Sequence, residues 1–393
     1  MPLVAIAGAR GKTTVAWMLQ AIADEVRWSI GSWLSSGVYV DGVVQPGELG
    51  PWKRVVLAAR YGELDLVLQE MTASTVVGAG LPAQTYPAAI LTTICANDDH
   101  CRFSAETTLE LRALDVLSAA IRPNGVIVAN ADDVLLADFA EEQPAETVLF
   151  ALRRENPVLQ NHLDRGGRAA WVDRGWIHFG TASSSTRIVQ PRDIPATLGG
   201  ALLLQVQNAL AATAFALCAG APADAVACAL QRFLPSPERQ PGSCNVYQRN
   251  GARVLVDSHV RLWSMRMLLR GIRRLRHRRI VAVSSCFPEL RDDDAREAGV
   301  LLSSVADAVL LYADPSWLGR VNDIRAAAVG SAASSIVLHK PSQREAVEWL
   351  LANLEHEDIG VIISEQPETT HQLLSAAGML GAPVAVALDQ AAN

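Results

Sequence analysis

The residues with the clearest chemical potential lie within the first fourteen positions. The segment Gly8–Thr14 (GARGKTT) follows a short apolar run and precedes a stretch whose apolar residues recur at helical spacing. A strand that turns through glycines into a helix directs free backbone N–H groups and the positive helix end at one point, which suits a phosphate group. The sequence therefore predicts a nucleotide-binding loop made by Gly8, Arg10, Gly11, Lys12, Thr13 and Thr14.

Two side chains of this loop have distinct expected roles. Lys12 would reach the β- and γ-phosphates, and the Thr13 hydroxyl would bind Mg²⁺. Only three of the 34 basic residues are lysines, namely Lys12, Lys53 and Lys340, so a lysine in this loop is unlikely to be accidental. The alternative interpretation is an ordinary tight turn between a strand and a helix. A P-loop kinase or GTPase is a weaker alternative, because such loops have a glycine where Ile6 stands.

Acidic and imidazole groups follow two further apolar runs. Glu70 comes after Leu64–Gln69, and Asp99 and His100 come shortly after Ala88–Ile94. Polar residues just beyond the carboxyl ends of parallel strands line the ligand crevice of an open α/β sheet. We therefore expect Glu70 and His100, with Thr13, to hold Mg²⁺ against nucleotide phosphates.

Length and composition limit the classes of protein. The 393 residues favour two domains, and 50% hydrophobic with 19% charged residues describes a soluble globular chain. The formal charge of −7 gives no reason to expect nucleic acid or an anionic membrane as partner, and no apolar run is long enough to span a bilayer. A start that passes directly into the loop leaves no room for a signal peptide. The sequence thus favours a cytoplasmic protein with six reduced, mostly buried cysteines.

The pattern of elements predicts an α/β protein. The first half shows strands and helices around a hairpin at Gly37–Val44, followed by a weaker region with a second hairpin at Trp171–Ile177, a polar loop at Thr181–Thr186 and two alanine-rich helices. A Pro/Gly-rich stretch at Pro235–Gly242 is the best domain boundary, which divides the chain into domains 1–240 and 241–393.

The second domain restarts the alternation of strands and helices. Strands are expected at 254–256, 280–283, 308–312, 361–364 and 384–387, with helices at 263–275, 294–305 and 343–354. The basic run Arg270–Arg279 lies at a predicted helix end, where cations suit the helix dipole. It is interpreted either as a solvated face or as a dock for a polyanion or an acidic partner.

These residues resemble the Mur ligase superfamily, and within it the C-terminal ligase half of cyanophycin synthetases. The resemblance spans nearly the whole chain. Its motifs include the loop at Gly8–Thr14, which has the shorter spacing of Mur-type ligases, and the segments Asp99-His100, Asn130–Asp133, Asn208–Ala212 and Val254–Asp257.

The resemblance implies a P-loop-containing central ATPase domain followed by a smaller Rossmann-like domain. It implies an ATP-dependent carbon–nitrogen ligase of the acid–amino-acid type, which joins a small-molecule carboxylate to an amine, or extends a peptide-like polymer, through an acyl-phosphate. ATP and Mg²⁺ would be the cofactors. There is no room for the domain that binds UDP-sugars, so a non-UDP substrate is expected. Asn208 would contact adenine, and Asp257 would lie at the ATP site between the domains.

Several family motifs are altered. Many members use a carbamylated lysine on the helix after the Asp-His motif, whereas the equivalent stretch here is Leu111–Leu114 and no lysine lies between Lys53 and Lys340. Arginine stays protonated and does not form that carbamate. Arg112 is therefore expected to supply positive charge in place of a second metal, which makes Lys12, His100 and Arg112 the candidate catalytic residues. The altered motifs also support an alternative: a catalytically degenerate, ligase-like subunit that binds nucleotide and serves as the partner of an active ligase. For either function, a protein partner or a homo-oligomer is an open alternative.

Overall fold

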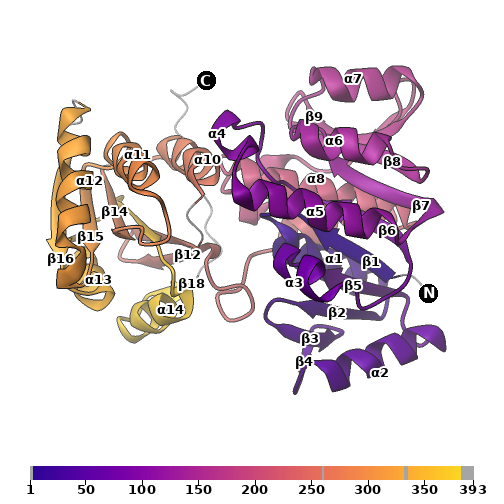
Figure 1. Ribbon diagram of the computed structural model, residues 1–393, viewed down its shortest axis with the longest axis horizontal. Coiled ribbons are helices and arrows are strands. Elements are labelled where there is room, and N and C mark those ends of the chain that lie inside the picture. Colours follow the sequence, from indigo (N-terminus) through magenta and orange to yellow (C-terminus); the bar gives the residue numbers. More distant parts are fainter. Residues whose placement is uncertain (1–2, 259–260, 332–334, 382–393) are drawn as a thin grey trace. The chain divides into compact units, whose positions relative to one another are not determined.

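The computed structural model describes residues 3–258, 261–331 and 335–381, apart from the side chains of Asp99, His100 and Leu380. The chain divides into two compact units, Met1–Phe233 and Leu234–Asn393. Each unit contains one mixed sheet with helices packed on it (Figure 1).

The first unit is built on an eleven-stranded sheet in the order β11-β10-β9-β8-β7-β6-β1-β5-β2-β3-β4. The central strands from β9 to β2 pair in parallel, and antiparallel hairpins extend both edges. The strands are β1 (Leu3–Ala7), β2 (Ile30–Leu34), β3 (Gly37–Val40), β4 (Val43–Gln45), β5 (Leu66–Glu70), β6 (Tyr86–Leu91), β7 (Ile121–Asn130), β8 (Glu146–Ala151), β9 (Arg168–Asp173), β10 (Trp176–Gly180) and β11 (Ser185–Arg187).

Helices cover both faces of this sheet, because the central strands are apolar on both sides. Along β1, Val4 and Ile6 pack with α1, α8 and α9, while Leu3, Ala5 and Ala7 pack with the helices of the opposite face. The helices are α1 (Lys12–Val26), α2 (Leu49–Arg60), α3 (Ala73–Ala79), α4 (Asp99–Arg102), α5 (Ala105–Ser118), α6 (Val134–Glu141), α7 (Pro157–Asp164), α8 (Leu203–Cys218) and α9 (Ala223–Arg232), with 3₁₀ turns η1 (Pro191–Asp193) and η2 (Pro195–Thr197).

The second unit has a seven-stranded sheet in the order β16-β15-β14-β17-β13-β12-β18, parallel from β16 to β13 and antiparallel beyond. Its strands are β12 (Ser243–Arg249), β13 (Ala252–Asp257), β14 (Ile280–Ser285), β15 (Ala308–Tyr312), β16 (Ile336–Lys340), β17 (Ile359–Ile363) and β18 (Leu380–Gly381). Its helices are α10 (Leu262–Arg273), α11 (Asp292–Ser303), α12 (Leu318–Gly330), α13 (Gln343–Asn353) and α14 (Pro367–Ala376), with the 3₁₀ turn η3 (Pro315–Trp317).

The α/β class and the main strand–helix alternation are confirmed. The hairpin predicted around Asp41-Gly42 is formed by β3 and β4, and both turn residues have the positive φ that such a two-residue turn requires. The strand pairing expected at 384–387 lies outside the described residues. Among the helices that the structure describes, none is long and apolar enough to cross a membrane.

Some sequence-based boundaries were wrong. The sequence predicts a helix over Thr107–Ile121, but α5 ends at Ser118, and Ile121 instead begins β7, because it pairs with Tyr86 of β6. The sequence Pro123–Gly125 predicts a stop after this helix, but it lies within β7, where Pro123 and Asn124 are exposed, Gly125 is buried and the pairing with β6 is irregular. Helices α2, α3, α6 and α7 were not predicted, and the polar loop at Thr181–Thr186 contributes to the edge strand β11.

The expectation that all six cysteines are reduced was also wrong. Cys95 and Cys101 form a disulfide, with their Cα atoms 5.7 Å apart. The short helix α4 folds the chain back after β6, which brings two cysteines six positions apart in the sequence within bonding distance. The other four are free thiols: Cys218, Cys228, Cys244 and Cys286.

Candidate active site

The predicted phosphate loop has the expected backbone. It connects the buried strand β1 to the N-terminus of α1, and both of its glycines have positive φ, 127° at Gly8 and 95° at Gly11. Gly11 is the N-cap of α1 and no side chain caps this helix end, whose first turn also lacks acidic residues. The uncapped N–H groups and the helix dipole make this end suitable for an anion.

The two candidate phosphate and metal side chains of the loop meet Glu70 at the end of β5. The Thr13 hydroxyl donates to Glu70 Oε2 at 2.9 Å, and the Lys12 ammonium lies 3.9 Å from Glu70 Oε1. Lys12 Nζ also donates to the Gly8 carbonyl at 2.7 Å. The backbone N–H of Ser35 donates to Glu70 Oε2 at 3.0 Å, which fixes the carboxylate from a third segment. The structure thus brings together Lys12, Thr13 and Glu70.

Thr92 and Thr93, which follow β6, form hydrogen bonds with the backbone of the phosphate loop. The sequence analysis did not predict this contact. The Thr93 carbonyl accepts hydrogen bonds from the Ala9 and Arg10 N–H groups at 2.8 and 3.2 Å. The Thr92 hydroxyl lies 3.1 Å from the Ala7 carbonyl oxygen and 2.6 Å from that of Arg10. A Cβ on Gly8 would stand only 2.4 Å from Thr92 Oγ1, so this close contact requires glycine.

Asn208, predicted to contact adenine, lies against the same loop. It is buried in α8, where its Nδ2 donates to Gln205 Oε1 at 3.0 Å. A Cβ on Gly11 would stand 2.2 Å from Asn208 Oδ1, so the amide is held directly beside the loop. Contact with adenine remains a prediction.

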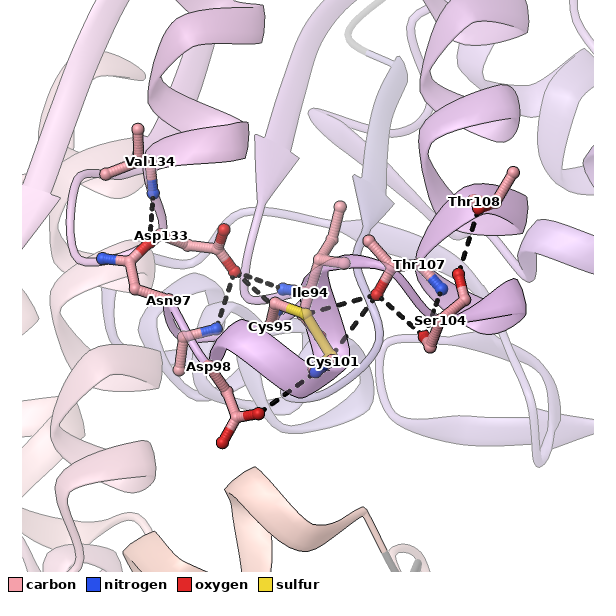
Figure 2. The surroundings of a disulfide bond; sticks show 11 residues. Ile94, Cys95, Asn97, Asp98, Cys101, Ser104, Thr107, Thr108, Asp133 and Val134 are labelled. Carbon is pink, nitrogen blue, oxygen red and sulfur yellow. Dashed lines mark hydrogen bonds between the residues drawn. A yellow bond between two sulfur atoms is a disulfide. The ribbon is translucent and has the colours of Figure 1, made fainter. Parts of the chain in front are cut away.

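The segment that carries Asp99 and His100 is anchored by Asp133. The carboxylate Oδ2 of Asp133 accepts from the N–H groups of Ile94, Cys95 and Ala96 at 2.8, 2.7 and 3.0 Å (Figure 2). Because the fully buried Asp133 follows β7, it ties this segment to the neighbouring strand. His100 is the second residue of α4, and its side chain lies outside the described part of the structure.

Two other predicted site residues, Arg112 and Asp257, are described by the structure, but no contact tests their predicted roles. Arg112 is exposed on α5, and none of the contacts among the described side chains joins it to the phosphate loop. Asp257 is buried at the end of β13 in the second unit, where its carbonyl accepts from the Ser364 N–H at 2.9 Å. The roles of Arg112 and Asp257 remain predictions.

The residues of the first unit fit a nucleotide with Mg²⁺. Lys12 and the N–H groups of α1 supply positive charge for phosphates, while the Thr13 hydroxyl and the Glu70 carboxylate supply the oxygen ligands that Mg²⁺ prefers. No group of three His, Cys, Asp or Glu side chains converges on one point among the described residues. Mg²⁺ bound here would therefore depend on nucleotide oxygens and water for further ligands, which is its usual mode of binding.

Three arginines at the end of the basic run Arg270–Arg279 form ion pairs within the second unit. Arg278 and Arg279 both donate to Asp358, whose carboxylate is fully buried, and Arg276 pairs with Glu357 at 3.0 Å. These contacts attach the end of the basic run to the turn before β17. The paired members therefore have a structural role in addition to their charge.

Comparison with known proteins decides the family. Residues 6–216 match the family model of the Mur ligase middle domain, which is more than half of the chain. The chain belongs to the Mur ligase middle-domain family. This Mur ligase domain includes the phosphate loop, Glu70, the Asp99-His100 segment and Asn208.

Curated relatives of this Mur ligase chain are cyanophycin synthetases. That of Synechocystis sp. is 27% identical over 324 residues, which cover 81% of this chain and 37% of the relative. That of Geminocystis herdmanii is 24% identical over 383 residues, which cover 93% and 42%. The chain thus spans about two fifths of the length of these relatives.

Solved structures share the fold. FolC from E. coli, in a complex with DHPP and ADP, aligns with a TM-score of 0.67 at 15% identity and covers 96% of this chain and 89% of its own. MurF ligase from Thermotoga maritima, in a complex with ADP, aligns with a TM-score of 0.62 at 16% identity and covers 95% and 78%. At these identities the likeness shows the Mur ligase type of fold alone.

Proposed function

We propose that this chain is an ATP-dependent amide ligase of the acid–amino-acid type, acting on a substrate without a UDP group, such as an amino-acid chain or polyamide. The observation that carries the proposal is the convergence of Lys12, Thr13 and Glu70 at the uncapped end of α1. The match to the Mur ligase middle domain and the cyanophycin synthetase relatives support the same reaction class.

In this reaction a carboxylate oxygen of the substrate attacks the γ-phosphorus of ATP, and ADP leaves. The amine of the second substrate then attacks the acyl carbon, and phosphate leaves as the amide bond forms. Lys12 and the first N–H groups of α1 would bind and orient the phosphates, and Thr13 and Glu70, with His100, would hold Mg²⁺. Bound Mg²⁺ would neutralise charge on the phosphates. Arg112 would add a positive charge, and Asn208 would position the adenine.

The altered motifs favour one alternative, a nucleotide-binding subunit without catalysis. The helix α5 carries no lysine, and where the resemblance to Mur ligases implies a Pro-Gly-Arg motif, this chain has Pro241-Gly242-Ser243. Such a subunit would keep the phosphate loop and use it to respond to nucleotide while an active ligase performs the chemistry. The intact Lys12, Thr13 and Glu70 constellation is needed by both functions.

Trapping the acyl-phosphate separates the two functions. The chain is incubated with ATP, Mg²⁺, hydroxylamine and a panel of amino acids, peptides and aspartate- or glutamate-rich oligomers. A ligase yields a hydroxamate and equimolar ADP with one class of carboxylate. ATP binding without a hydroxamate from any carboxylate would reject the ligase in favour of the non-catalytic subunit. Lys12→Ala serves as the matched negative control, because it removes the phosphate-binding cation.

A further inference from the structure

The disulfide Cys95–Cys101 closes a small ring in the segment after β6, close in the chain to the residues that support the phosphate loop. It encloses the segment that contains Asp99 and His100, and it joins α4 to the chain that leaves β6 (Figure 2). The buried Thr107 of α5 lies beside the bridge, with its hydroxyl oxygen 3.2 Å from the Cys95 sulfur and 3.3 Å from the Cys101 sulfur. The bridge therefore links α4 covalently to the chain after β6 and lies in contact with α5.

Global stability does not explain this crosslink. Disulfides stabilise most when they close long loops or staple domains that lack a sufficient core. Here the two cysteines are six positions apart, and the unit has extensive buried clusters on both faces of its sheet. What the bridge constrains is local: a segment in which Ala96 and Asn97 both have positive φ and which is otherwise held by Asp133.

The crosslinked segment adjoins the phosphate loop. Cys95 lies two residues after Thr93, whose carbonyl accepts from the Ala9 and Arg10 N–H groups of the loop. The three N–H groups bound by Asp133 begin directly after Thr93, at Ile94. The restrained segment and the carbonyl that supports the phosphate loop are therefore adjacent in the chain.

We propose that Cys95–Cys101 is a redox-responsive crosslink that tunes nucleotide binding by restraining α4 and the support of the phosphate loop. This inference rests on the proposed nucleotide binding. Residue Cys101 is partly exposed whereas Cys95 is buried, so we expect a dithiol reductant to attack the Cys101 sulfur first. A thiolate of the reductant attacks the Cys101 sulfur, and Cys95 leaves as a thiolate and takes up a proton. The second thiol of the reductant then displaces Cys101 as a thiol, so two electrons and two protons pass to the protein and the reductant leaves as its disulfide.

The test compares oxidised and reduced full-length chain, with the redox state of each cysteine verified by alkylation and mass spectrometry. We expect reduction to weaken MgATP binding in calorimetry by about fivefold or more, the usual size of coupling between sites. We also expect faster amide hydrogen exchange over residues 94–104 and at Ala9 and Arg10. Reoxidation should restore both properties.

Variants identify the thiols responsible. Cys95→Ala/Cys101→Ala should bind MgATP like the reduced chain and should not respond to the reductant, while Cys218→Ala/Cys228→Ala should respond like wild type. Reversible reduction of the wild-type chain compares the same two redox states without any substitution. The inference can therefore still be tested if a variant misfolds. Equal MgATP affinity in the two redox states, or faster exchange that stops short of Ala9 and Arg10, would overturn the inference. If neither state binds ATP but exchange at Ala9 and Arg10 responds to reduction, the proposed nucleotide binding fails and the coupling of the crosslink to the loop stands.

Discussion

Lys12 is the cation on which the candidate site depends. Its ammonium bonds to the Gly8 carbonyl and lies near Glu70, so it already stands between the loop and the candidate metal ligand. We expect Lys12→Ala to weaken MgATP binding by about 100-fold, because hydrogen bonds to charged groups contribute roughly 1.5–3 kcal/mol. Calorimetry measures the effect, with Lys53→Ala, an exposed lysine of α2, as the control. Equal affinity of wild type and Lys12→Ala would remove Lys12 from the site.

Arg112 is tested at the level of turnover. With no lysine on α5 to carry a carbamate, we expect a one-metal site whose activity does not respond to added bicarbonate. His100→Ala and Arg112→Ala should each lower the rate of hydroxamate formation by about 100-fold, a typical loss when one group that stabilises developing charge is removed. Arg60→Ala, at the exposed end of α2, is the control for a general loss of positive charge. Stimulation by bicarbonate, or full activity of Arg112→Ala, would contradict this assignment.

At the scale of elements, Asp133 joins two strands of the sheet at the edge that carries the site. Its carboxylate binds three consecutive N–H groups of the segment after β6. Asp133→Ala leaves these buried donors without their acceptor and should lower the free energy of unfolding by about 3 kcal/mol or more. Urea denaturation measures the loss. Asp138→Ala, an exposed residue of α6, should change stability little, and a similarly small loss for Asp133→Ala would show that water replaces the carboxylate.

In the second unit, Asp358 ties the basic run to the turn before β17. Burial raises the pKa of this carboxyl, but hydrogen bonds from Arg278, Arg279 and the Glu355 N–H outweigh burial and bring its pKa below the ordinary value. A carboxyl whose pKa is depressed on folding adds stability above its unfolded pKa of about 3.9, and this stability is lost as pH falls through the folded pKa.

The consequence is a stability difference that depends on pH. Asp358→Asn should lower the free energy of opening of β17 by about 3 kcal/mol at neutral pH, because two arginines lose their anionic partner. The difference from wild type should shrink below about pH 4. Native-state hydrogen exchange of β17 measures it, with the exposed Asp293→Asn as the control. A difference that does not change between pH 7 and pH 3 would show that the contribution is not electrostatic.

At the scale of the whole molecule, the chain forms two compact units whose boundary in the sequence lies between Phe233 and Leu234, beside the Pro/Gly-rich stretch Pro235–Gly242. Ligases that complete their site with a second domain need that domain to move, and hinges are formed by a few loop residues. We predict that MgATP analogue reduces the radius of gyration in small-angle scattering. Lys12→Ala, at the same ligand concentration, should not compact. An unchanged radius in wild type at saturating ligand would count against a closing hinge.

The sequence by itself determined the phosphate loop and the α/β class. Both depend on residues that are contiguous in the sequence. Gly8 and Gly11 permit the positive φ of the loop, and Lys12 follows at the start of α1. The apolar periodicity that indicates strands and helices is likewise a local pattern. It also pointed to Glu70, because a polar residue directly after a buried strand stands at the ligand edge of a parallel sheet.

Only the tertiary structure decided how distant residues meet. The Thr13–Glu70 hydrogen bond spans 57 positions, and the bonds from Asp133 to the segment after β6 span 37 to 39. Both depend on the order of strands in the sheet, which places β5 beside β1 and β7 beside β6. Alternation of apolar residues identifies strands but carries no information on their neighbours. The Cys95–Cys101 bridge was not predicted either, because cysteine spacing alone does not show that a short helix turns the chain back on itself.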